Sequence, residues 1–152
     1  YVENKSQILI RIRLHPINVE VEILNHSAKS ELSTTVKLQK AVTTFVKRAL
    51  NSPQLSYSLM FEPIDPTLEH ERFRSKQLIK QSIKEILAEG KVNGEFDFED
   101  LNTAALCVVG AMTFVVIEPL NPSRNVSFDA AYREYFIKQI ADFCLNAVRA
   151  KV

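Results

Sequence analysis

The chain has 152 residues, of which 46% are hydrophobic and 24% are charged, the balance of one globular domain with a sizeable core rather than of a disordered chain. Its formal net charge of +1 supplies no overall attraction to nucleic acid or to an anionic membrane. Only three glycines are present, which excludes most Gly-rich phosphate-binding loops and indicates a helical fold with few tight turns.

The first thirty residues carry two conflicting patterns. Aliphatic residues alternate along 8–14 and again along 19–23, on either side of 15–18, which is typical of a β-hairpin. Asn4 followed by Gln7 instead resembles a helix N-cap and its partner three residues later. The residues alone leave strand and helix open here.

From residue 34 onward, apolar residues recur at the three- and four-residue spacing of amphipathic helices. After a first helix that includes 38–49, Ser52–Pro53 predicts an N-cap and a first-turn proline, which open a short helix to Met60. Pro63 ends that helix. Asp65–Pro66 repeats the start signal and predicts a long helix that stops near Gly94, since glycine accepts the left-handed conformation at a C-terminus.

Two further helices are predicted in the last third of the chain. Asp97, with Asp100 three residues later, resembles a capping box for a helix over 98–118, and the final helix is expected over 128–150. The uncharged run 101–117 is too short for a membrane span and predicts a buried helix. Cys107 and Cys144 lie in apolar runs, and we expect both to be buried free thiols.

The opening YVENKSQIL, residues 1–9, resembles the stretch that joins the DNA-binding head of TetR-family bacterial transcriptional regulators to their regulatory domain. In this family an aromatic residue and Asn-Lys precede a helix, so the resemblance favours a helix bent at Pro16 over the hairpin. Further similarities follow in the family's order. They are FEPIDP at 61–66, ILAEG at 86–90 with GEF at 94–96, and AAL at 104–106 with GAM at 110–112.

The resemblance implies an all-α, TetR-like C-terminal bundle of about six helices that dimerises through the last two. Residues 1–5 would be the remnant of the junction to the DNA-binding head, and 6–152 the ligand-binding and dimerisation domain. Tyr1 and Lys5 match positions that often contact the DNA backbone in the family. Since base readout needs a helix in the major groove, we expect operator binding only through a head that this chain largely lacks.

The resemblance also implies a cavity for a small, mainly apolar effector, although core packing is the competing explanation for the same side chains. The expected ligand-binding residues are Phe45, Tyr57, Met60, Phe61, Phe73, Arg74 and Met112. Arg74 follows Phe73 near the start of the long helix, where it can pair with a ligand carboxylate or, equally, with Glu62 or Asp65. The other basic residues of that helix are expected on a solvated face.

The dimer interface expected from the resemblance uses small residues for close helix approach and large ones for apolar area. Its residues are Leu106, Gly110, Phe114, Tyr132, Phe136, Ile140 and Phe143. The same apolar area can alternatively serve a single-chain core. A ligand would favour one setting of the first helix by population shift and so release the operator, with Pro16 as the hinge.

No enzymatic chemistry is expected from the residues. A metal site is not expected at His26, four residues after Glu22, or at His70, and the acidic cluster at 95–100 is explained by negative charge at a helix N-terminus. Nucleophile-elbow and phosphate-loop motifs are absent from the sequence. The resemblance to the TetR family implies a cytoplasmic bacterial regulator, a repressor without a cofactor or membrane contact. The alternative is a helical dimerising protein-interaction module without a ligand cavity.

Overall fold

The computed structural model describes residues 22–26 and 28–151, and in this part every regular element is helical. The helices are α2 (Thr34–Asn51), α3 (Pro53–Phe61), α4 (Pro66–Val92), α5 (Leu101–Phe114), the 3-10 turn η1 (Val115–Ile117) and α6 (Ala130–Val148). The all-α expectation is confirmed for the described residues. The predicted junction at 1–5, with Tyr1 and Lys5, the Asn4 cap and the Pro16 bend lie outside them.

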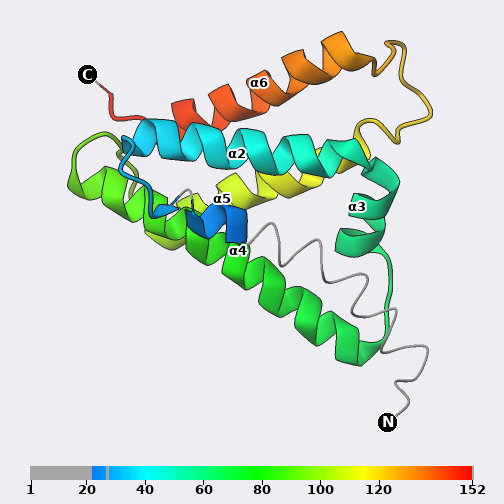
Figure 1. Ribbon diagram of the computed structural model, residues 1–152, viewed down its shortest axis with the longest axis horizontal. Coiled ribbons are helices and arrows are strands. Elements are labelled where there is room, and N and C mark those ends of the chain that lie inside the picture. Colours follow the sequence, from blue (N-terminus) through cyan, green and yellow to red (C-terminus); the bar gives the residue numbers. More distant parts are fainter. Residues whose placement is uncertain (1–21, 27, 152) are drawn as a thin grey trace.

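Helix α2 is the centre of the bundle. It contacts α3, α4, α5 and α6, and Figure 1 shows it running between α6 on one side and α4 on the other. Its inner positions, among them Leu38, Val42 and Val46, are fully buried and join one hydrophobic core with residues of α4, α5 and α6. Burial of this continuous core is the main stabilising contribution to the fold.

The predicted start signals of α3 and α4 are confirmed by position. Pro53 and Pro66 are the first residues of their helices, and the Asp65 side chain accepts a hydrogen bond from the Thr67 backbone N–H. Gly94, with φ of 82°, follows α4 and turns the chain back. Glycine is required there because a side chain would be strained in this left-handed conformation.

The predicted start of the next helix is wrong by three residues. Asp100, rather than Asp97, is the N-cap of α5, and its side chain accepts from the Thr103 N–H at 2.6 Å. Asp97 instead belongs to an extended stretch, and its backbone N–H donates to Val148 O at 2.7 Å, beside the β-bridge between Phe96 and Arg149. The extended stretch that contacts the end of α6 therefore stands where the sequence predicts the first residues of the helix, 98–100.

The helical segment 22–26 is fastened to α2 and α4. Leu24 is buried in the core, and Ser82 of α4 donates to the Asn25 side-chain oxygen at 2.5 Å. Lys37, only 4% exposed, donates to Ala28 O and forms a 2.8 Å ion pair with Glu89. Residues Leu24, Asn25 and Ala28 are therefore held against the bundle by polar contacts as well as by apolar burial.

Glu95 ties the turn after α4 to the first turn of α2. One of its carboxylate oxygens accepts both from the Thr35 backbone N–H and from the Thr35 hydroxyl, each at 2.8 Å. These two hydrogen bonds hold the pKa of Glu95 below its ordinary value of 4.5, and partial burial opposes them.

We expect Glu95→Gln to lower the free energy of unfolding at pH 7 by about 1 kcal/mol, the usual worth of a helix cap. Because the pKa is depressed in the folded state, this contribution is complete above the unfolded pKa and is lost as the pH falls through the folded pKa. Urea titrations at pH 7 and pH 3 should therefore show a difference between wild type and variant that shrinks in acid. A difference that is constant with pH would contradict the assignment.

Candidate functional site

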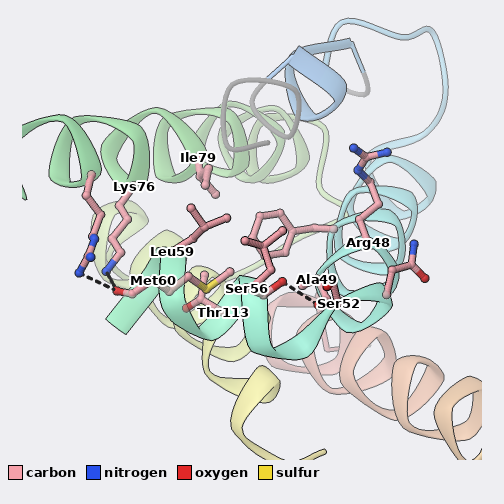
Figure 2. A pocket seen from close by; sticks show the side chains of 13 residues that line it. Arg48, Ala49, Ser52, Ser56, Leu59, Met60, Lys76, Ile79 and Thr113 are labelled. Atoms are coloured by element: carbon pink, nitrogen blue, oxygen red, sulfur yellow. Dashed lines mark hydrogen bonds between the residues drawn. The ribbon is translucent and has the colours of Figure 1, made fainter. Parts of the chain in front are cut away.

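A cavity of about 230 Å³ lies where α2, α3, α4 and α5 meet. Most of its wall is apolar, and its polar lining comes mainly from the end of α2 and from α4. The lining residues are Phe45, Arg48, Ala49, Asn51, Ser52, Leu55, Ser56, Leu59, Met60, Arg72, Lys76, Ile79 and Thr113. In Figure 2, Leu59 and Met60 lie between Lys76 at one end of the group and Arg48 at the other.

Helix α3 forms one wall of the cavity because the chain bends sharply at Ser52–Pro53. The Ser56 hydroxyl donates to Ala49 O at 2.7 Å, which holds the first turn of α3 against α2. None of the nine residues of α3 is fully buried, although Leu59 and Met60 are half-buried. The inner side of α3 therefore faces a space that protein side chains leave partly unfilled.

Two cations of α4 hold the other end of α3. Arg72, 5% exposed, donates to Glu62 O at 2.5 Å and to Met60 O at 3.5 Å, and Lys76 donates to Met60 O at 3.0 Å. These carbonyls lie at the C-terminus of α3, where a helix lacks intrahelical partners and where its dipole favours positive charge. Arg72 also forms a 2.8 Å ion pair with Glu69, one turn earlier on α4.

The cavity is electropositive at this end. Desolvation by burial and the neighbouring Arg72 cation lower the pKa of Lys76, and Glu69 opposes them. In the described part of the chain, Arg72 Nε is buried without a hydrogen-bond partner. Among the described residues that line the cavity, three are cationic and none is acidic.

Only two residues of the predicted ligand set, Phe45 and Met60, line this cavity. Met112 is fully buried in the core, whereas Tyr57 and Phe61 lie on the surface side of α3, 38% and 37% exposed. Phe61, Phe73 and Met60 border a separate hollow of about 220 Å³ among α3, α4 and α5. The structure therefore divides the predicted set among the cavity, the core and the outer surface.

The placement of Arg74 beside an interior cavity is wrong. Its side chain is 71% exposed and lies 3.9 Å from Glu71, so it pairs neither with Glu62 nor with Asp65. Arg72 and Lys76, which were expected on a solvated face, are the cations that reach the cavity. The four-residue spacing of Arg72 and Lys76, shared with the buried Leu68, is the signal that could have identified them.

A second hollow, of about 690 Å³, opens on the outer side of α5 and α6. Five of the seven predicted dimer residues border it: Gly110, Phe114, Phe136, Ile140 and Phe143. Phe114 and Phe143 are 60% and 68% exposed, and Leu106 on the same side of α5 is 57% exposed. Tyr132 is half-buried in an aromatic cluster with Phe128 and Phe136, and Ile140 is 9% exposed. Tyr132 and Ile140 therefore pack beneath the outer surface of α5 and α6 rather than being exposed on it.

The expectation that 101–117 is a buried helix is wrong for one side of α5. Ala105, Val108, Val109 and Met112 are buried, but the opposite side faces outward and carries no charge. That side consists of Asn102, Thr103, Leu106, Cys107, Gly110 and Phe114. Cys107 is consequently exposed, whereas Cys144 is buried and its pKa is raised to about 11 by desolvation.

His26, His70 and the acidic cluster at 95–100 are the remaining positions that bear on metal binding and helix capping in the described ranges. No group of three or more His, Cys, Asp or Glu side chains that could hold a metal ion occurs there. In the acidic cluster, Asp100 caps the following helix α5, as expected, whereas Glu95 bonds Thr35 in the first turn of α2, which the sequence did not predict. No described helix is long and apolar enough to cross a membrane.

Comparison with known proteins identifies the fold. No family model and no curated protein matches the sequence. Among solved structures, the chain is similar to a transcriptional regulator of the TetR/AcrR family from Thermobifida fusca YX-ER1, with a TM-score of 0.77 and 19% identity over 99% of this chain and 78% of that chain. A bacterial regulatory protein in the TetR family from Rhodococcus RHA1 has the same TM-score, with 16% identity over 98% of this chain and 76% of that chain.

These similarities define the class of fold. The described chain has the all-helical fold of TetR/AcrR-family regulators, and the resemblance drawn from its sequence is confirmed at that level.

Proposed function

We propose that this chain is the ligand-binding and dimerisation part of a TetR-type transcriptional regulator, acting in the bacterial cytoplasm as a repressor. In this proposal residues 6–152 form the regulatory domain, and residues 1–5 join it to a helix-turn-helix head that contacts operator DNA. The observation that carries the proposal is the cavity inside a bundle of this fold, lined by α2, α3, α4 and α5. An apolar wall with a few polar groups is the usual form of a small-molecule site.

Helix α4 both lines the cavity and contacts the helical segment 22–26, so it connects the ligand site to the N-terminal side of the chain. Lys76 and Ile79 line the cavity, and Ser82, one turn after Ile79, bonds to Asn25. A ligand that favours one setting of α4 would therefore also favour one setting of the segment 22–28. We propose that this shift moves the attached heads, with Pro16 as the hinge, and releases the operator.

The outer side of α5 and α6 is proposed to bind a second copy of this chain. A solvent-facing helix normally carries charges, but the outer side of α5 carries none. Gly110 lies in mid-helix, where glycine costs about 1 kcal/mol relative to alanine, and a Cβ there would meet no atom within 4 Å of its own subunit. The cost is explained if the missing side chain allows another helix to approach closely.

Thermal denaturation with a library of small apolar compounds tests the ligand site. We expect some compounds to raise the melting temperature of the wild type, because a ligand that binds only the folded state stabilises it. Leu59→Trp, which fills the cavity, should abolish the increase, whereas Leu78→Trp on the exposed side of α4 should retain it. Compounds that stabilise both variants equally would place the binding site elsewhere.

The competing candidate is a helical interaction module that dimerises but binds a protein rather than a small molecule. The exposed aromatic side chains Phe61, Phe73 and Tyr135 are compatible with it. The module does not explain an apolar cavity in which α3 packs loosely. We therefore favour the regulator.

A further inference from the structure

The charges around the cavity restrict its ligand more narrowly than its apolar wall does. Arg48, Arg72 and Lys76 all line it, and no acidic residue is found among its described lining residues. The nearby carboxylate of Glu69 is half exposed and is already paired with Arg72 at 2.8 Å. At the α4 end of the cavity, the charge of Lys76 is thus not paired with any carboxylate among the described lining residues.

Lys76 is the cation best placed to bind a ligand group. Among the described residues, its ammonium group donates to one oxygen, Met60 O at 3.0 Å, and lies 5.7 Å from the centre of the Phe61 ring. A lysine ammonium has three N–H donors, so a carbonyl and a ring face leave hydrogen-bonding capacity for a ligand. Burial and the like charge of Arg72 disfavour its charged form, and an anion at this position would relieve both effects.

Arg72 adds a second buried cation beside Lys76 at this end of the cavity. Its side chain is 7% exposed, and its Nε atom is buried without a hydrogen-bond partner among the described residues. A buried donor without a partner is unfavourable, and such groups are uncommon in folded proteins. The unused donor and the incompletely bonded ammonium of Lys76 belong to residues one helical turn apart.

We infer that the effector is a small carboxylate with an apolar body, an inference that rests on the proposed ligand site. The carboxylate pairs with Lys76, and the apolar body lies against Leu59, Met60 and Ile79. The size of the cavity, about 230 Å³, suits a monocarboxylate with a short aliphatic or aromatic body. The apolar wall excludes a simple inorganic anion, because such an anion would lose hydration without compensation there.

Matched acids and primary amides test the inference on the whole chain. The pairs are hexanoate and hexanamide, octanoate and octanamide, and phenylacetate and phenylacetamide, titrated at pH 7 while amide NMR shifts of the residues around the cavity are followed. Acid and amide have nearly the same shape, so their affinity ratio isolates the charge. We expect at least one acid to bind roughly tenfold more tightly than its amide, since charge-assisted hydrogen bonds are about twice as strong as neutral ones.

Variants of two lysines on α4 supply the control. Lys76→Met keeps the apolar stem and should remove the preference for acid over amide while amide binding persists, and Lys76→Gln should do the same while keeping a donor toward Met60 O. Lys80→Met should leave the preference intact, because Lys80 contacts Asn102 and lies outside the cavity lining.

The outcomes separate this inference from the proposed function. Amides that bind in the cavity as tightly as their acids would overturn the carboxylate assignment and leave the ligand site standing. Inorganic phosphate that binds as tightly as the acids would also overturn it. If neither member of any pair shifts the residues around the cavity, both the carboxylate assignment and the proposed ligand site fail.

Discussion

Replacing Leu106 with glutamate should convert a dimer of this chain into a monomer. Leu106 is 57% exposed on the uncharged side of α5, beside Gly110 and in line with Phe114. In a two-fold interface each substitution occurs twice, so two carboxylates would be placed without partners in an apolar contact. Removal of a central apolar anchor together with burial of an unpaired charge should weaken dimerisation by roughly a hundredfold or more.

Sedimentation velocity over a dilution series measures this effect directly. Leu78→Glu is the matched control, because Leu78 is a leucine of similar exposure, 42%, on the outer side of α4. It should leave the dimer intact. Circular dichroism should show the same helix content in both variants, since both side chains face outward. If Leu106→Glu dimerises like the wild type, the outer side of α5 is not the dimer interface.

The second large effect is expected from Gly90→Ala, near the end of α4. A Cβ at this position would lie 2.0 Å from Cδ2 of Phe96, far inside van der Waals contact. Phe96 is 2% exposed, and its backbone N–H donates to Gly90 O at 2.9 Å, so the ring is held against the glycine. We expect the variant to lose about 2 kcal/mol of unfolding free energy despite the better helix propensity of alanine.

Gly110→Ala is the matched control for this prediction, because both glycines are helical and a Cβ at Gly110 would meet no atom within 4 Å. Both variants should be studied in the Leu106→Glu background, so that dimerisation does not enter the measured stability. In urea titrations, Gly110→Ala should be neutral or stabilising. Addition of Phe96→Ala should remove the cost of Gly90→Ala, and two additive losses would show that the clash is not its cause.

The sequence by itself determined the helical class and several helix starts. Ser52–Pro53 and Asp65–Pro66 begin α3 and α4 as predicted, because a cap and a first-turn proline act on backbone groups within three or four residues. The apolar periodicity of α2 likewise identifies its buried side, since Leu38, Val42 and Phe45 all enter the core. Each of these signals is local and needs no knowledge of distant partners.

Only the tertiary structure decided which residues share a site. Successive helical residues point about 100° apart, so the rotation of α4 against α2 and α3 determines that Arg72 reaches the cavity while Arg74 faces solvent. The packing of α5 and α6 against other helices likewise decides that Cys107 is exposed and Cys144 is buried. Tertiary structure also decides that a side chain is excluded at Gly90 but not at Gly110, because the turn at Gly94 brings the ring of Phe96 against Gly90. Local sequence cannot specify these contacts, since their partners come from other elements of the chain.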